Sequence, residues 1–115
     1  MKVQAHISWD EVLQGQGFTF LRESETWVKI ITREGGDIFL YATTYRISGR
    51  LTISARYDGS EIVSLTLGDR PAYGATPWRS HASVGFLRAV HDALAALLTI
   101  EASVPQPERH VFLRM

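Results

Sequence analysis

The sequence predicts an α+β fold: an antiparallel meander sheet of about five strands packed on one long C-terminal helix, with a short N-terminal helix before the sheet. Two observations indicate this class. Runs of β-branched and aromatic residues alternate with short turn-forming breaks from Phe18 to Leu67. A helical period of apolar residues then follows in the last third of the chain. The 115 residues are expected to form one domain, residues 1–115.

The first element is a short helix in the segment SWDEVLQG. Ser8 is expected to be its N-cap, and Glu11, three positions later, completes a capping box. Gly15 is expected to end the helix, because glycine adopts the left-handed conformation that terminates helices.

The strands come next, separated by the breaks ESE, REGGD, SG and DGS. Breaks this short make consecutive strands pair in antiparallel fashion. Asp58-Gly59 is the strongest hairpin signal, because both residues tolerate the positive φ of a two-residue turn. The expected strands are Phe18 to Arg22, Thr26 to Thr32, Ile38 to Arg46, Arg50 to Tyr57 and Ile62 to Leu67.

Side chains alternate between the two faces of a strand, which identifies a sheet face available for function. In the fourth strand, one face carries Leu51, Ile53, Ala55 and Tyr57, and the other carries Arg50, Thr52, Ser54 and Arg56. The polar set is expected to face water or a partner. In the third strand, Tyr41, Thr43 and Tyr45 share one face, opposite Ile38, Leu40 and Ala42.

The long helix is expected from Ser80 to Ala102, ending before the prolines of SVPQP. Its apolar stripe should pack on the sheet: Phe86, Leu87, Val90, Leu94, Leu97 and Leu98. The opposite face groups His81, Arg88, Asp92 and Thr99. His91 borders the apolar stripe and is expected to be a packed, hydrogen-bonded imidazole.

Composition narrows the function classes. Twelve Lys and Arg balance twelve Asp and Glu, and there is no cysteine. Because the charges balance, no overall electrostatic field draws the chain to nucleic acid or membrane. Because there is no cysteine, thiolate zinc sites are excluded. The absence of a signal core or an apolar run of about 18 residues predicts a cytoplasmic protein with no membrane association.

Catalytic and metal motifs are missing from the sequence. The four histidines lack the i, i+4 spacing that aims two imidazoles at one metal. There is no nucleophile elbow and no phosphate loop. We therefore expect no metal and no cofactor, and a binding protein rather than an enzyme. If catalysis occurred, His81, Arg88 and Asp92 would be the residues to consider.

The stretch GDRPAYGATPWRSHAS, residues 68–83, follows neither the strand nor the helix period. Guanidiniums and aromatic rings beside a helix N-terminus suit a small anion or a nucleotide. The candidate ligand residues are Arg70, Tyr73, Trp78 and Arg79. The alternative interpretation is that TPWR is only the entry to the long helix, with Trp78 packed on the edge of the core.

The order of elements, a meander followed by a helix reading GFLRAVHDALAALL, resembles PUR-type and, more loosely, Whirly-type single-stranded nucleic-acid-binding domains. The resemblance implies that the helix covers one sheet face, that two units associate, and that the open strands stack bases on aromatic rings. It implies the following binding surface: Tyr41, Tyr45, Arg46, Arg50 and Arg56.

Three functions remain open. The first is binding of single-stranded DNA or RNA on the open sheet face. The second is a protein-binding module, such as an inhibitor, an immunity protein or an accessory subunit, in which a homodimer is one expected partnership. The third is small-anion or nucleotide binding at residues 68–79. A flat face lined by Arg and Tyr would favour nucleic acid, and an apolar patch would favour a protein partner.

Overall fold

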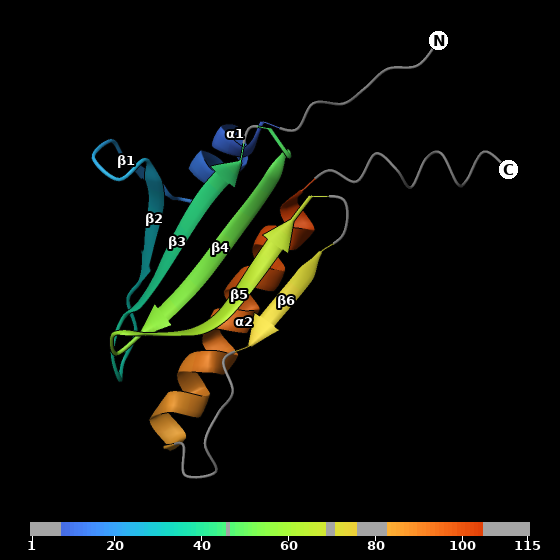
Figure 1. Cartoon of the computed structure of the whole chain (residues 1–115). Helices are drawn as coiled ribbons and strands as arrows, with labels where there is room; N and C mark the ends of the chain where they lie inside the picture. The colour runs from blue at the N-terminus through green and yellow to red at the C-terminus, as the bar shows by residue number, and fades with distance from the viewer. Residues whose placement is uncertain (1–7, 46, 69–70, 76–82, 105–115) are drawn as a thin grey trace, which may run out of the picture.

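The computed structural model describes residues 8–45, 47–68, 71–75 and 83–104. In chain order, its elements are α1 (Trp9–Gly15), β1 (Thr19–Leu21), β2 (Thr26–Ile31), β3 (Ile38–Tyr45), β4 (Arg50–Tyr57), β5 (Ser60–Leu67), β6 (Ala72–Ala75) and α2 (Val84–Ser103). The strands form one six-stranded sheet in the order β1-β2-β3-β4-β5-β6, with every neighbouring pair antiparallel. The predicted α+β meander is confirmed (Figure 1).

The Asp58-Gly59 hairpin forms as predicted. Tyr57 pairs with Ser60 across the turn, and the two central residues have φ of +52° and +79°. Positive φ at both positions matches the right-handed twist of the flanking strands. The sheet has one strand more than expected, because β6 lies in the segment whose sequence suggested a loop.

Both helices cover the same face of the sheet, and the core lies between them and the strands. Figure 1 views the molecule from the other side, with α2 behind β5. The alternate residues of β3 and β4 that were expected to point inward are buried: Ile38, Leu40, Ala42, Leu51, Ile53 and Ala55. Leu13 of α1 joins the same buried cluster.

A β-bulge in β5 changes which side chains reach this core. The register shifts between Ala55 and Arg56 of β4, so that Ile62 has no direct partner. Ile62 and its neighbour Val63 are consequently both buried, although successive residues of a regular strand point to opposite faces.

The apolar stripe of α2 is rotated from the predicted position. The buried residues are Ala89, Val90, Ala93, Leu97 and Ile100. Leu87 and Leu98, which were predicted to pack on the sheet, are exposed. The prediction gave weight to large side chains, whereas the helix places alanines against the sheet, and small side chains allow a close approach. His91 is also not packed as predicted, since its side chain is 86% exposed.

The N-cap of α1 agrees with the prediction, whereas Ser83, the N-cap of α2, was not predicted, because the sequence placed the start of this helix at Ser80, which lies outside the described residues. The Ser8 hydroxyl accepts from the Glu11 amide at 3.4 Å, and the Ser83 hydroxyl accepts from the Phe86 amide at 3.1 Å. Gly15 remains inside α1, whose C-cap is Gln16. Trp9 fastens α1 to the β3–β4 turn, because its Nε1 donates to the Gly49 carbonyl at 2.9 Å.

Candidate functional site

The face of the sheet opposite the helices is not covered by any described residue, and we call it the open face. Strand register aligns its side chains in rows. One row crosses all six strands: Thr19, Val28, Tyr41, Ser54, Ser64 and Gly74. A second row joins Ile30, Phe39, Arg56 and Glu61, and a third joins Thr43, Thr52, Thr66 and Ala72.

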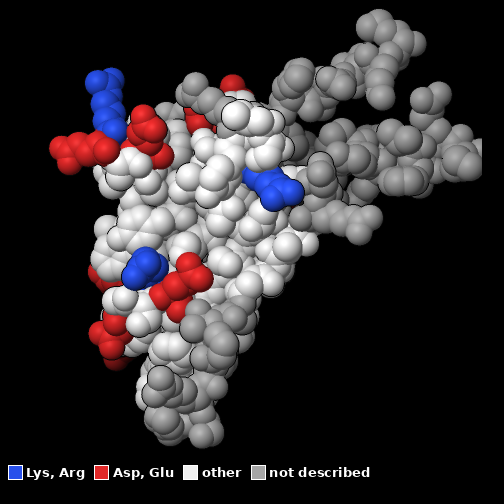
Figure 2. Space-filling view, in the orientation of Figure 1, with Lys and Arg blue, Asp and Glu red and all other residues white. Residues whose placement is uncertain are grey.

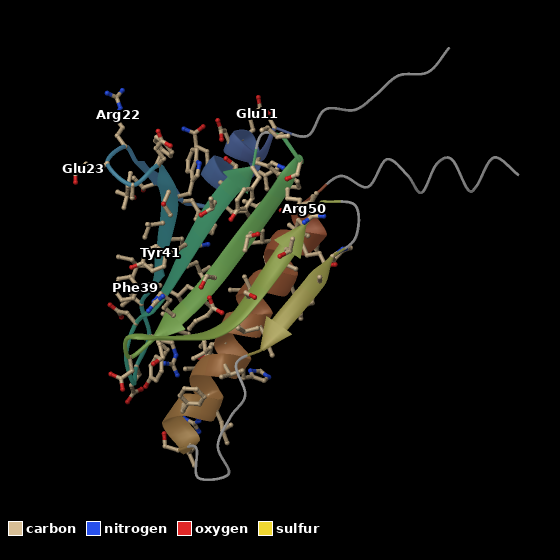
Figure 3. All side chains as sticks on the ribbon, in the orientation of Figure 1. Glu11, Arg22, Glu23, Phe39, Tyr41 and Arg50 are labelled. Carbon is tan, nitrogen blue, oxygen red and sulfur yellow. The ribbon has the colours of Figure 1, made fainter. Side chains whose placement is uncertain are left out.

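The β2–β3 half of the open face is apolar. Val28 pairs with Tyr41 and Ile30 with Phe39, so four large side chains lie next to one another. The rings of Phe39 and Tyr41 stack with centroids 6.3 Å apart and an interplanar angle of 13°. Ile30 is 51% exposed, whereas Val28, Phe39 and Tyr41 are half-buried. We call these four residues the apolar quartet; Figure 3 shows Phe39 and Tyr41 neighbouring each other on β3.

The β4–β5 half carries small hydroxyl side chains instead. Thr43, Thr52 and Thr66 are in register across three strands, and Ser54 pairs with Ser64. These side chains are shorter than the rings beside them. The open face therefore has two halves: an apolar half with large side chains, and a hydrogen-bonding half with shorter side chains.

Charged side chains are sparse on the open face, and most of those present have partners. Arg56 Nη2 donates to the Gly59 carbonyl at 3.0 Å within its own hairpin. The Ser54 hydroxyl donates to Glu61 Oε1 at 2.6 Å. Figure 2, which views this face, shows mostly uncharged atoms with a few separate charged groups. The described part of this face thus presents no continuous basic track.

Four of the five residues proposed for nucleic acid lie in the described part of the chain. Tyr41, Tyr45, Arg50 and Arg56 belong to the open face, as strand alternation predicts, whereas Arg46 lies outside the described residues. Tyr45 and Arg50 pair at one end of the strands, and Figure 3 shows Arg50 far from Tyr41. The set is therefore spread over the face rather than gathered.

The sequence reasoning did not identify Val28, Ile30 or Phe39 as members of the surface. Four of the six residues of β2, TWVKII, are apolar and they occur on both faces, so alternation gave no clear contrast between the faces. The pairing of β2 with β3 could have identified these residues, because the sequence had already assigned the face of β3 on which Tyr41 lies.

Of the candidate ligand residues in 68–79, Arg70, Trp78 and Arg79 lie outside the described residues. Tyr73 lies on β6, and its hydroxyl donates to Glu101 Oε1 at 2.5 Å, near the C-terminal end of α2 rather than at its N-terminus. The pKa of Tyr73 is raised to about 12, mainly because burial removes water from its hydroxyl. The hydrogen bond to Glu101 and the negative charge of Glu101 raise this pKa further.

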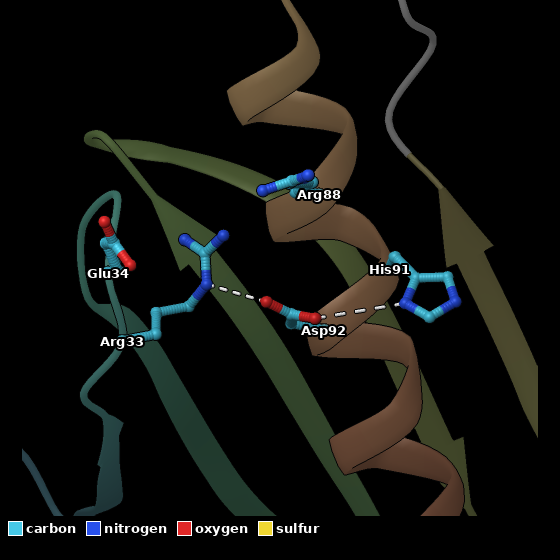
Figure 4. A pocket seen from close by; sticks show the side chains of 5 residues that line it. All are labelled: Arg33, Glu34, Arg88, His91 and Asp92. Carbon is cyan, nitrogen blue, oxygen red and sulfur yellow. Dashed lines mark hydrogen bonds and ion pairs between the residues drawn. The ribbon is translucent and has the colours of Figure 1, made fainter.

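A separate hollow of about 440 Å³ lies between the β2–β3 turn and α2, lined by Arg33, Glu34, Arg88, His91 and Asp92 (Figure 4). Arg33 is held firmly: its Nε donates to Asp92 Oδ2 at 2.7 Å, and its Nη1 donates to the Gly36 carbonyl at 3.0 Å. Its guanidinium also lies 5.8 Å from the centre of the Tyr57 ring.

The hollow is better explained as a structural clamp than as a catalytic site. The Tyr57 hydroxyl donates to the Gly35 carbonyl at 2.9 Å, so the turn is tied to both β4 and α2. His91 Nδ1 is 3.9 Å from Asp92 Oδ1, too far for a hydrogen bond. Arg88 and Asp92 do lie near each other, but His81, the third residue considered for catalysis, is outside the described residues.

The fold and the open face define a two-layer α+β protein with one sheet face left uncovered by the described residues. Neither described helix combines the length and the apolar character that crossing a bilayer requires. No protein-family model, curated protein or solved structure matches the chain.

Proposed function

We propose that the chain is a binding module that docks a protein partner on its open face. The observation that carries the proposal is the apolar quartet: Val28, Ile30, Phe39 and Tyr41. Ile30 is exposed and its three neighbours are half-buried, and contiguous apolar patches on the surface of a soluble protein commonly mark interaction sites. A patch of this kind with a polar surround matches the composition of protein interfaces, whose apolar centre is enclosed by hydrogen-bonding groups.

The hydroxyl half supports the same function. Thr43, Thr52 and Thr66 offer donors and acceptors that adapt to a partner surface without the desolvation cost of charged groups. The partner expected here has a mainly uncharged surface with an apolar centre that fits against the aromatic pair of β3.

Single-stranded nucleic acid is the second candidate, and the Tyr45–Arg50 pair favours it. The two side chains are exposed and in register, which would place a ring for stacking beside a cation for phosphate. Affinity for nucleic acid depends on neutralising several phosphates. On the described open face, Arg56 is bonded to its own hairpin and lies opposite Glu61, which leaves Arg50 as the main contribution.

The test compares the wild-type chain with two variants of equal charge change. Ile30→Glu places a carboxylate in the apolar quartet, and Leu98→Glu places one on the opposite side of the molecule. Both positions are more than half exposed, so both variants should fold, as far-UV circular dichroism will check. The wild-type chain is used to isolate a partner from nuclease-treated lysate of its source, and the purified partner is titrated calorimetrically into each variant.

The proposal predicts that Ile30→Glu weakens binding at least tenfold, since a charge buried at the centre of an interface costs more than about 1.4 kcal/mol. Leu98→Glu should bind the partner like the wild type. Equal affinities of Ile30→Glu and wild type would overturn the proposal. A labelled single-stranded oligonucleotide of about 20 nucleotides tests the second candidate. If the wild type binds the oligonucleotide at low salt and Arg50→Glu does not, the ligand of the open face is nucleic acid rather than a protein.

A further inference from the structure

β6 is an edge strand whose outer side has no partner among the described residues. It pairs only with β5, through Val63 to Thr66. Its sequence, AYGA, has none of the charged side chains that commonly keep edge strands from pairing with other chains. At the other edge, β1 runs directly into Arg22 and Glu23. Among the described residues the two edges of the sheet are therefore unequal, and β6 is the edge strand that lacks charged side chains.

α2 has a second apolar stripe, separate from the one that packs on the sheet. Val84, Leu87 and Leu98 are exposed, and Leu94 is only partly buried. Together with His91, these residues follow the spacing i, i+3, i+7, i+10 and i+14. This spacing places the residues along one stripe of the helix surface. We call Val84, Leu87, Leu94 and Leu98 the α2 flank.

The α2 flank lies on the same side of the molecule as the β6 edge. The hydrogen bond from Tyr73 of β6 to Glu101 places β6 beside this side of the helix, since Glu101 is adjacent to Leu94 and Leu98 on the helix surface. Asp92, on the opposite side of α2, turns instead toward Arg33 of the β2–β3 turn, as Figure 4 shows. The C-terminal part of the flank, Leu94 and Leu98, thus lies beside the edge strand, whereas Val84 and Leu87 lie about 20 Å or more from Glu101 along the helix axis.

The charge of the chain does not oppose the association of two copies. The chain has no net charge, with His counted as neutral, so two copies do not repel each other overall. α2 has no acidic residue in its first turn and no basic residue in its last turn. Its helix dipole is therefore not offset by these side chains, and an antiparallel neighbouring helix would offset it.

We propose that two copies associate through β6 and the α2 flank about a two-fold axis perpendicular to the sheet. This axis pairs β6 with β6 of the second copy in antiparallel fashion and continues the six-stranded sheet into the partner. It also places both α2 helices on the same face, running in opposite directions.

The spacing of strands agrees with this arrangement. Strands in a sheet are about 4.8 Å apart, so the two β5 strands would be separated by about 14 Å. α2 packs mainly on β5, and directly packed helices are about 8–10 Å apart. The remaining space between the helices is of the size that Tyr73, Leu94 and Leu98 of each copy would fill. The two open faces would then point in the same direction.

Sedimentation velocity over about 1 to 100 µM tests the proposal, a range suited to an interface of moderate size. The wild type is expected to dimerise within it, and Leu98→Glu should raise the dimer dissociation constant at least tenfold. Ile30→Glu, with the same charge change on the open face, should dimerise like the wild type. Amide hydrogen exchange should slow in β6 as concentration rises.

Three outcomes would overturn the proposal. These are a wild type that remains monomeric throughout the range, a dimer that Leu98→Glu leaves unchanged, and a dimer that only Ile30→Glu dissociates. The last would place self-association on the open face. The self-association proposal fails or holds independently of the protein partner, because the partner is tested by Ile30→Glu and the dimer by the α2 flank.

Discussion

The clamp around Arg33 makes the clearest quantitative prediction for stability. Replacing Arg33 with Met keeps most of the side-chain stem but removes the ion pair with Asp92, the bond to the Gly36 carbonyl and the contact with Tyr57. Arg33 is 13% exposed and Asp92 is 45% exposed, so solvent partly screens the pair, which we take as about 1 kcal/mol. The other two contacts contribute about as much again.

Arg33→Met is therefore expected to lower the free energy of unfolding by about 2 kcal/mol. Urea unfolding followed by circular dichroism should show the midpoint falling by about 1 M, for a slope of about 2 kcal/mol per M. Arg88→Met is the matched control, because Arg88 lines the same hollow and is exposed. A double-mutant cycle with Asp92→Asn should give a coupling of about 1 kcal/mol. Equal midpoints for Arg33→Met and Arg88→Met would refute the clamp.

The remaining predictions concern the core, the caps and pH. Leu97→Ala should cost about 3 kcal/mol in urea unfolding because Leu97 is fully buried, whereas Leu98→Ala at about 1 µM should cost under about 0.5 kcal/mol. Ser83→Ala should cost about 1 kcal/mol and reduce helicity by removing the α2 N-cap; an unchanged unfolding midpoint would contradict this. Gly36→Ala should lower the melting temperature, because φ is +120° and a Cβ would lie 3.1 Å from the Tyr57 ring.

The pH prediction belongs to the same group and follows from Tyr73. Its pKa is about 12 in the folded chain against 10.0 ordinarily, so the unfolded chain loses the proton first as pH rises. Stability from this group is complete below pH 10 and declines between pH 10 and 12. Tyr73 is 42% exposed, so screening limits the loss to about 1 kcal/mol or less. Tyr73→Phe should show a correspondingly smaller decline in alkaline urea titrations, and an identical decline would contradict the assignment.

Much of the fold could be predicted from the sequence because its signals are local. The Asp58-Gly59 turn needs only positive φ at two residues, and the alternation in β4 separates an apolar face from a polar one. β6 could not be found in this way, since AYGA is short and contains no β-branched residue.

The orientation of α2 and the composition of the open face depend instead on contacts between elements. Ala89 and Ala93 face the sheet because their small side chains let the helix approach closely. A ranking by hydrophobicity would instead favour Leu87 or Leu98. The alternation that assigned Tyr41 to the open face gave no answer for Ile30, whose strand is apolar on both sides. Only the pairing of Ile30 with Phe39 completes the apolar quartet.

The most direct test of the central claim is the affinity of the purified partner for Ile30→Glu compared with Leu98→Glu. If the open face is the binding surface, Ile30→Glu will bind at least tenfold more weakly than the wild type, and Leu98→Glu will bind like the wild type. If both variants bind like the wild type, the apolar quartet does not contact the partner, and the proposed function is wrong.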